Sequence, residues 1–489
     1  MNYILLAPEI LLTILALVIV LTGLLIKDKT KNALGYLGAA GLAASLLLVL
    51  GTKGESSFFY NALVIDPLSQ VFKLIFLIVS LLAVLASIAY FKDHRNQDEY
   101  YALLLLATVG MMVVASANDL VALFVGFELA SMSTYVLAGF EKKNPSSLEA
   151  ALKYFIIGSL SSALMLFGMS LVYGITGSTN INAIIEFFRT STATAPTGLE
   201  IVALMFLIAG FGFKMALVPF HMWAPDTYEG SPTVVSALLA AGSKKMGFVA
   251  AFRVLVLALV AVRVDLQMTF AILAVITMTY GNIVAISQRS IKRMLAYSSI
   301  AQAGYIALAF VVTTQMSIAG GVLLALGHGL MKGGAFLVVA VVGYMVLSDN
   351  KSAKNIDDLG NFAGLGKRAP ITAFAMLVFV LALAGVPPSA GFIGKFVLFY
   401  SVTVEAIRLA STWLLLVVIV AILNSALSLY YYARIIKYMY VLPSDGEKIK
   451  EPAPYVAAIV LAVIGTIGIG LYPEPFIQMA LDAAKVLGV

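Results

Sequence analysis

Charged residues inside apolar stretches are the feature of this sequence that points most directly to chemistry. Glu128 lies in the stretch LVALFVGFELASMSTYVLAGF. About eight basic residues also lie inside such stretches: Lys73, Lys153, Lys214, Lys244, Lys245, Arg253, Lys332 and Lys395. A charge at the centre of a membrane helix costs about 2.5–3.5 kcal/mol. So many of them indicate a function that requires charge at this depth.

A proton relay is the chemistry that such residues can perform. Desolvation lowers the pKa of a lysine towards physiological pH, and a nearby carboxylate raises it again. A lysine in this state can take up and release a proton, and its neighbours can switch it. Glu128, Lys214, Lys332 and Lys395 are the candidates hardest to explain by the alternative, a buried ion pair that serves only structure.

Three further lysines are open to other interpretations. Lys153 follows Glu149 by four residues, so a plain ion pair along one helix is the alternative to a relay role. Lys244 and Lys245 are adjacent and point about 100° apart, so we do not expect both to face one path.

Histidine and the remaining basic residues complete the set of candidates. His328 and Lys332 stand four residues apart on one helix face, where they could exchange a proton; the alternative is a core histidine. Lys73 and Arg253 lie near helix ends, and we expect their side chains to extend to the membrane surface.

Two aromatic segments carry no functional prediction. His221, in the segment HMWAPD, is expected to be structural. Tyr430–Tyr432, near the end of a span, are expected to belong to the interfacial aromatic belt.

The elements that position these residues must be membrane helices. The chain is 61% hydrophobic and 11% charged, whereas a soluble domain carries roughly a quarter charged residues. Runs long enough to span a bilayer recur along the whole sequence. The predicted fold is an all-α polytopic membrane protein with about fourteen transmembrane helices, near residues 3–26, 32–51, 68–91, 100–116, 118–140, 147–174, 200–221, 231–260, 265–287, 291–313, 318–347, 369–404, 409–440 and 452–472.

The distribution of basic residues predicts the orientation. About 18 Lys and Arg fall on one side of this arrangement and about 5 on the other, and the positive-inside rule places the richer side in the cytoplasm. We therefore expect a multi-pass protein of the cell membrane with both termini outside. The first run is expected to be a retained helix. The clusters on the richer side are Lys27/Lys29/Lys31, Lys142/Lys143, Arg289/Lys292/Arg293 and Lys367/Arg368.

Two helices are predicted to be broken near the middle of the membrane. Lys214 precedes Pro219 by five residues, and the Pro387–Pro388 pair interrupts a long span just before Lys395. Discontinuous helices of this kind surround ion paths at the membrane midplane. Ordinary proline kinks are the alternative.

The residues that are missing also limit the function. The chain has no cysteine and three histidines, which excludes iron–sulfur clusters and thiolate metal sites. We expect no cofactor in this chain. The net charge of +6 does not indicate a nucleic-acid partner, because most of the basic residues lie on one side of the membrane, as the positive-inside rule expects. The longest stretches outside the spans, 177–199 and 347–368, are too short for an extramembrane domain.

Several long motifs resemble a known family. They are ASANDLVALFVGFELASMSTYVLAGF, SLEAALKYFIIGSLSSALMLFG, FKMALVPFHMWAPDTYEGSPTVVSALLAAGSKKMGF, IKRMLAYSSIAQAGY and LAGVPPSAGFIGKFVLF. They resemble subunit N of bacterial respiratory complex I, the NADH–quinone oxidoreductase, an antiporter-like proton-pumping subunit. The resemblance implies two inverted five-helix repeats with helices 7 and 12 broken. We expect one transmembrane domain, with three helices in 1–99, repeats in 100–262 and 263–440, and a last helix in 441–489.

The resemblance also implies roles and partners. Glu128 matches the glutamate of helix 5 and Lys214 the lysine of helix 7 that pairs with it. The other matching lysines are Lys153 on helix 6, Lys244 on helix 8 and Lys395 on helix 12, and Lys245 is an addition. The implied partners are the other membrane subunits of the assembly. NADH, FMN, iron–sulfur clusters and quinone are implied in other subunits of the complex.

One feature departs from the family pattern. The His328–Lys332 pair resembles the other antiporter-like subunits more than the usual subunit N. The chain is therefore either a divergent subunit N or part of a related complex with a different electron donor. We expect a proton-translocating subunit coupled to quinone reduction in neighbouring subunits. The alternatives are a subunit of a multisubunit cation/proton antiporter and a purely structural membrane subunit.

Overall fold

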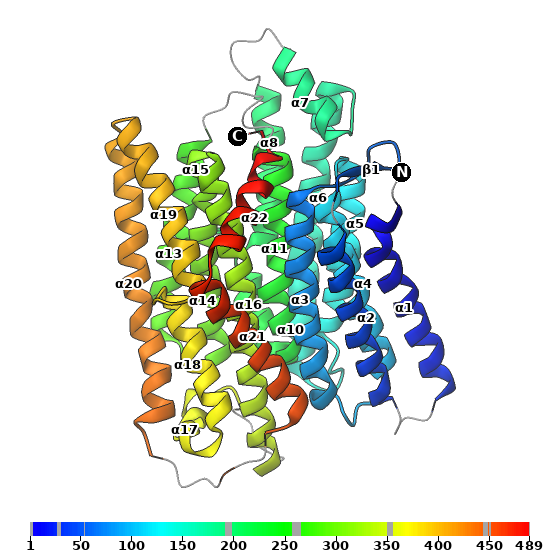
Figure 1. Ribbon diagram of the computed structural model, residues 1–489, viewed down its shortest axis with the longest axis vertical. Helices are drawn as coiled ribbons and strands as arrows, with labels where there is room; N and C mark the ends of the chain where they lie inside the picture. Colours follow the sequence, from blue (N-terminus) through cyan, green and yellow to red (C-terminus); the bar gives the residue numbers. More distant parts are fainter. Residues whose placement is uncertain are drawn as a thin grey trace.

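The computed structural model describes residues 3–26, 31–52, 54–190, 198–256, 266–349, 356–443, 448 and 451–488. These residues form a bundle of long helices that run between an upper and a lower end (Figure 1). Fourteen of the described helices are long and apolar enough to cross a membrane, as the sequence predicted. The protein is a multi-pass membrane protein.

The first part of the chain forms three long helices and a short hairpin. Two strands, Ser56–Phe58 and Leu63–Ile65, pair antiparallel at the upper end of the bundle. The elements are η1 (Tyr3–Leu6), α1 (Ala7–Leu25), α2 (Asn32–Gly51), β1 (Ser56–Phe58), β2 (Leu63–Ile65) and α3 (Pro67–Tyr90).

Two five-helix units follow, and equivalent helices pack in the same way in both. In the first unit α4 packs along α5 and α6 along α8; in the second, α13 packs along α14 and α16 along α19. Since five spans separate equivalent helices, the second unit runs through the membrane in the opposite direction. The elements of the first unit are α4 (Gln97–Ser116), α5 (Leu120–Ala138), α6 (Pro145–Thr176), α7 (Ile181–Thr190), α8 (Gly198–Met215), α9 (Trp223–Gly230), α10 (Thr233–Leu238), η3 (Leu239–Ser243), α11 (Lys244–Ala251) and η4 (Phe252–Val256).

The second unit is followed by two C-terminal helices that pack against it and against the N-terminal helix α3. Helix α21 contacts α3 as well as α16 and α18, and α22 contacts α3 and α16. The predicted boundary between the two units, after residue 262, lies outside the described residues. The elements are α13 (Gln267–Ser287), α14 (Ile291–Ala307), α15 (Ala309–Val312), α16 (Gln315–Asp349), η5 (Leu359–Phe362), α17 (Leu365–Arg368), α18 (Pro370–Ala384), α19 (Ala390–Arg408), α20 (Thr412–Tyr440), α21 (Ala453–Leu471) and α22 (Glu474–Lys485).

Both predicted helix breaks are present. Helix α8 ends at Met215, and the chain is non-helical until α9 begins at Trp223. Helix α18 ends at Ala384, and α19 begins at Ala390. A third irregularity was not predicted: the eighth span contains two π-helical segments, η3 and η4. Segments of this kind are frequent at functional sites.

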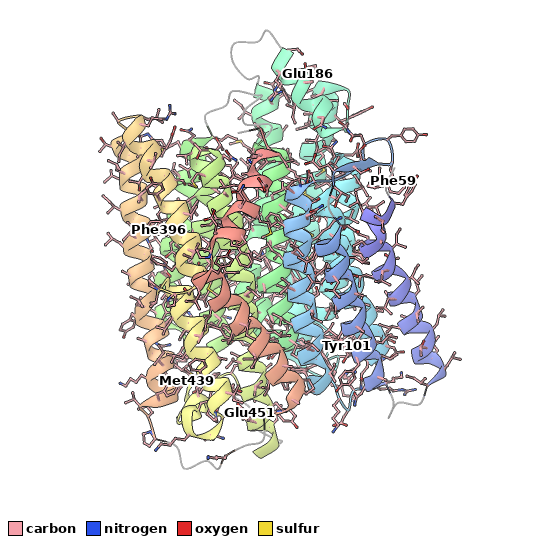
Figure 2. The ribbon with its side chains drawn as sticks, viewed as in Figure 1. Phe59, Tyr101, Glu186, Phe396, Met439 and Glu451 are labelled. Carbon is pink, nitrogen blue, oxygen red and sulfur yellow. The ribbon has the colours of Figure 1, made fainter. Side chains whose placement is uncertain are left out.

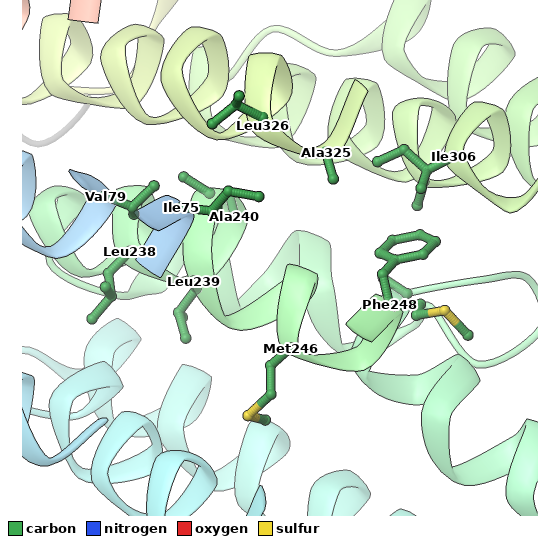
Figure 3. Packing of buried hydrophobic residues seen from close by; sticks show 14 of the residues in the cluster. Ile75, Val79, Leu238, Leu239, Ala240, Met246, Phe248, Ile306, Ala325 and Leu326 are labelled. Carbon is green, nitrogen blue, oxygen red and sulfur yellow. The ribbon is translucent and has the colours of Figure 1, made fainter. Parts of the chain in front are cut away.

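Side chains sort by depth as expected for a membrane protein. Phe396 projects from the outside of the bundle, and Glu186 and Glu451 lie at its opposite ends (Figure 2). The interior is packed with aliphatic side chains from the third, eighth, tenth and eleventh spans, for example Val79 and Leu326 (Figure 3). This packing encloses the polar groups described below in an apolar shell.

The predicted positions of two basic side chains are wrong. Lys73 and Arg253 do not extend to the membrane surface but are 1% and 4% exposed. Lys73 Nζ lies 2.6 Å from the Glu9 carboxylate, so α1 also contributes a buried glutamate to the bundle. Arg253 Nη2 donates to both carboxylate oxygens of Asp66 at 2.8 and 3.0 Å. Lys73 is enclosed because other helices surround α3. Arg253 is enclosed beside the end of α4, where its Nε donates to Ala115 O at 2.6 Å.

We predict that the Asp66–Arg253 pair is needed for stability. Replacing Arg253 with methionine leaves the Asp66 carboxylate buried and unpaired, at a cost of about 3–5 kcal/mol. The thermal unfolding midpoint of the purified protein should therefore fall. The double variant D66N/R253M should regain most of the loss, and a single variant as stable as the wild type would contradict the prediction.

Candidate functional site

Lys214 is held in an aromatic cage just before the first helix break. Its Nζ donates to Ser131 Oγ and Tyr154 Oη, both at 2.9 Å. It also lies 5.2–5.8 Å from the ring centroids of Phe127, Tyr135 and Tyr154, a distance at which rings attract a cation. The side chain is fully buried. The cage can therefore stabilise an ammonium group without any opposite charge.

The expected pairing of Glu128 with Lys214 is not formed. Both residues are described, and no ion pair within 4.0 Å joins them. Glu128 is half-buried rather than buried and accepts a hydrogen bond from Ser162 of α6 at 2.5 Å. Ser131, one turn along α5 from Glu128, is the residue that contacts Lys214. Glu128 thus lies beside the cage without neutralising its charge.

Lys153 belongs to a polar cavity at the lower end of the bundle. Its side chain is 43% exposed and pairs with Glu149 at 2.7 Å and Asp226 at 2.8 Å. The plain ion pair that the sequence left open is therefore formed. Arg293 pairs with the same Asp226 at 2.8 Å. Lys153 is fixed at the cavity wall and stands apart from the buried lysines.

This cavity of about 680 Å³ is rich in carboxylates. Burial raises the pKa of the Asp357 carboxyl, and the ammonium group of Lys292, 3.3 Å away, opposes that shift. Tyr154, which follows Lys153 on α6, contacts Lys214, so the cavity wall adjoins the buried site. The charged residues that line the cavity are Glu141, Glu149, Lys153, Asp226, Glu229, Lys292, Arg293, Asp357 and Asp358.

Both lysines of the eighth span are buried, and they point to different partners. Lys244 Nζ donates to Ser299 Oγ of α14 at 3.0 Å and lies 5.6 Å from the Tyr228 ring centroid. Lys245 Nζ is 2.5 Å from His328 Nδ1 of α16 and donates to Ala240 O of η3 at 2.7 Å. The expectation that the two lysines diverge is correct. However, both directions lead into the same polar interior.

Lys332 of α16 contacts α14, the tenth span, which also contacts Lys244. Its Nζ donates to Ser298 Oγ at 2.7 Å and to Leu295 O at 3.2 Å. Ser298 and Ser299 are neighbours on α14, so one pair of hydroxyls contacts both Lys332 and Lys244. The basic residues that interact electrostatically with Lys332 are Lys244, Lys245 and Lys395.

Lys395 lies at the second helix break. Its Nζ donates to Leu383 O at 2.9 Å, Ala384 O at 3.3 Å and Ser425 Oγ at 2.9 Å. The last carbonyls of a helix have no partner within it, so the break at α18 provides acceptors for this ammonium group. Gly385, with a φ of +92°, leaves room for the Lys395 side chain, because a Cβ at this position would lie 3.2 Å from Lys395 Cδ.

Five of the buried lysines share one electrostatic property. Within the described residues, no carboxylate lies within 4.0 Å of any of these ammonium groups, and each contacts hydroxyl, carbonyl, imidazole or aromatic groups instead. The lysines concerned are Lys214, Lys244, Lys245, Lys332 and Lys395. A site of this kind can hold and pass protons, because no fixed anion traps the charge.

A lysine and two tyrosines of the site were not predicted from the sequence. Lys245 was set aside, although it contacts His328. Tyr431 and Tyr432 were assigned to the interfacial belt, which is wrong: they are 0% and 1% exposed, and only Tyr430 faces outward. Three consecutive residues on a helix point in different directions, so a run of tyrosines cannot all face lipid. The polar pair Ser298–Ser299 within an apolar helix was a signal that could have been used.

Comparison with known proteins is consistent over the whole chain. Residues 117–425 match the family model described as NADH:quinone oxidoreductase/Mrp antiporter, TM. The chain is 55% identical to F420H2 dehydrogenase subunit N of Methanosarcina mazei, over 99% of this chain and 98% of that protein. It is 40% identical to NADH-quinone oxidoreductase subunit N of Trichlorobacter lovleyi, over 98% of this chain and 96% of that protein.

A solved structure agrees with these relatives. A chain of respiratory complex I from Thermus thermophilus superposes with a TM-score of 0.79 and 32% identity, covering 96% of this chain and 98% of that one. The family model covers more than half of the sequence, and the relatives match it nearly from end to end. The chain therefore belongs to the family of NADH:quinone oxidoreductase/Mrp antiporter transmembrane proteins, among the proteins named subunit N.

Proposed function

We propose that this chain is the proton-translocating subunit N of a complex I-like dehydrogenase, and that protons move through its buried lysines. The observation that carries the proposal is the row of ammonium groups without carboxylate partners, linked across α14 by Ser298 and Ser299. As a subunit of such a translocase, the chain works with neighbouring membrane subunits. Quinone reduction in those subunits supplies the energy.

The proposed path begins at the carboxylate-rich cavity and ends beyond the second helix break. Protons pass from the cavity to Lys214 and then to Lys244. The hydroxyls of α14 carry them to Lys332, with His328 assisting, and Lys395 releases them to the outer face. Glu128 acts on Lys214 through the electric field beside the cage, since the two do not touch. Lys153 shapes the field of the cavity through its two ion pairs.

The orientation and location follow from the charge distribution. Lys367 and Arg368 of α17 lie at the lower end of the bundle, and α1 begins at the opposite end (Figure 1). The positive-inside rule makes the lower end cytoplasmic, so we propose that both termini lie outside the cell membrane. Lys27 and Lys29, which the sequence assigned to the same side, lie outside the described residues.

Redox chemistry is assigned to other subunits. The sequence has no cysteine to ligate an iron–sulfur cluster, and the described residues contain no group of three or more His, Asp or Glu that could hold a metal. The polar interior is lined by lysines and hydroxyls, which bind protons. We propose that NADH or another donor, flavin, clusters and quinone are all bound elsewhere in the assembly.

Replacing Lys332 with methionine should stop proton movement through this chain. The change keeps the length of the side chain but removes the group that carries the proton, so the contribution of this subunit should fall by about tenfold or more. The measurement is the number of protons translocated per electron pair by the assembled complex in vesicles. Lys143→Met, at an exposed lysine of the lower surface, is the matched control.

Two outcomes would count against the path. An unchanged proton-to-electron ratio in K332M would show that protons do not pass through Lys332. Poor assembly with an unchanged ratio in the complex that does assemble would favour a purely structural subunit.

The identity of the donor has a second candidate. The relative at 55% identity is named for F420H2 and the one at 40% for NADH, and the first value favours reduced F420. The His328–Lys332 pair, unusual for subunit N, is consistent with a related complex of this kind.

We predict that membranes containing the complex oxidise F420H2 faster than NADH. The two rates are measured with the same quinone analogue as acceptor, and deletion of this chain's gene should abolish the faster one. A rate with NADH that exceeds the rate with F420H2 would assign the complex to the NADH-dependent class.

A further inference from the structure

The proposed path has a gap between its last two lysines. Lys332 lies on α16 and contacts α14, whereas Lys395 lies on α19 and contacts the end of α18 and Ser425 of α20. The two ammonium groups share no hydrogen-bond partner among the described residues. A proton that moves from one to the other needs groups between them that can both accept and donate.

Helix α20 carries such groups on one face. Ser425, Ser428 and Tyr432 are spaced by three and four residues, which aligns them along one side of a helix. From Ser425 to Tyr432 the helix rises about 10 Å, at about 1.5 Å per residue. Ser428 and Tyr432 are buried, and Ser425 is partly buried. Among the described residues, none of the three hydroxyls forms a hydrogen bond with a carboxylate.

The two ends of this hydroxyl face contact the two lysine sites. At one end, Lys395 Nζ donates to Ser425 Oγ at 2.9 Å. At the other end, Tyr432 Oη is hydrogen-bonded to Ser298 Oγ, and Ser298 accepts from Lys332 at 2.7 Å. Between them, Ser428 Oγ donates to Ser425 O at 2.6 Å. Ser425 Oγ in turn donates to Ala384 O at 3.0 Å. The face therefore carries hydroxyls from one lysine site to the other, and two of them now donate to backbone carbonyls.

Gln302 of α14 also connects the Lys332 site with the Lys395 site. Its Nε2 donates to Leu383 O at 2.9 Å, and the same carbonyl accepts from Lys395 at 2.9 Å. Gln302 lies one turn after Ser298 on α14 and beside Tyr432. The amide thus fixes the α18 carbonyl of the Lys395 site against the helix that holds Ser298.

We propose that Tyr432, with Ser298 and the serines of α20, is the proton relay between Lys332 and Lys395; this inference rests on the function proposed above. An N–H bond breaks at Lys332 as Ser298 Oγ takes the proton and passes its own hydroxyl proton to Tyr432 Oη. Tyr432 passes its proton on to Ser428 and Ser425 when these two hydroxyls rotate away from the carbonyls Ser425 O and Ala384 O, and an N–H bond forms at Lys395. Each hydroxyl gains one proton and loses one, so no charge stays on it.

Tyr100 offers a matched control. It lies on α4, is fully buried, and its hydroxyl is hydrogen-bonded to Ser87 Oγ of α3 at 2.7 Å. Tyr432 is likewise a buried tyrosine bonded to a serine. Among the described residues, neither Tyr100 nor Ser87 hydrogen-bonds a lysine. Loss of the Tyr100 hydroxyl therefore removes a buried hydrogen bond of the same kind without interrupting the relay.

The test compares Tyr432→Phe with Tyr100→Phe in the assembled complex. Each change removes one oxygen atom. We expect Y432F to lower the rate of proton translocation through this chain by about tenfold and to lower the proton-to-electron ratio, and Y100F to leave both at the wild-type value. Unchanged translocation in Y432F would overturn the relay, and so would an equal loss in both variants, since that would indicate a packing effect.

Two further variants separate this inference from the proposed function. If K332M keeps the wild-type ratio, the proposed function itself fails. If K332M loses translocation and Y432F does not, only the relay is wrong. A relay in series also predicts that S298A/Y432F is no more impaired than Y432F alone. Additive losses in the double variant would contradict a single shared route.

Discussion

The structure depends on how an ammonium group can be kept in an apolar interior without a carboxylate. Transfer of a charge from water to such an interior is costly unless polar groups replace the lost hydration. In this protein, the replacement consists of neutral dipoles. Lys214 has two hydroxyls and an aromatic cage, Lys395 has two carbonyls and a hydroxyl, and Lys245 has a carbonyl and an imidazole.

The helix irregularities are the source of several of these dipoles. A regular helix uses nearly all of its carbonyls internally, and only its ends leave some free. The end of α18 provides Leu383 O and Ala384 O to Lys395, and the π-helical turn η3 provides Ala240 O to Lys245. The breaks therefore do more than bend the chain: they place acceptors at a depth where no water-exposed group could reach.

Like charges in this interior must also limit one another. The charged neighbours of His328 are Lys245, Lys332, Lys244 and Lys395, and in a medium of low dielectric constant their repulsion acts over several ångströms. Full protonation of all these groups at once is therefore unfavourable. In the proposed path, a proton that arrives at one end favours the departure of another further along, and this coupling requires no movement of helices.

The fold could be predicted from the sequence because the sequence signals for membrane helices and helix breaks are strong and local. Apolar runs, prolines and glycines predicted fourteen spans and both helix breaks. The site was predicted only in part, because burial depends on neighbours that one sequence does not reveal. Lys73 and Arg253 sit near helix ends, but the surrounding helices enclose them. The separation of Glu128 from Lys214, the contact of Lys245 with His328 and the inward direction of Tyr432 depend on rotations of packed helices, which hydropathy does not encode.

The depth of the lysines has an electrical consequence. Lys214 and Lys395 lie next to helix breaks, and Lys244 and Lys332 lie near the middle of their spans. In the proposed path, the steps between these lysines therefore run mainly parallel to the plane of the membrane. Moving one charge across the full membrane potential involves about 2.3 kcal/mol per 100 mV, but a sideways step crosses little of that drop. Voltage should thus act mainly on the two short legs that connect the lysines with the aqueous phases, and hardly at all on the long lateral part between them.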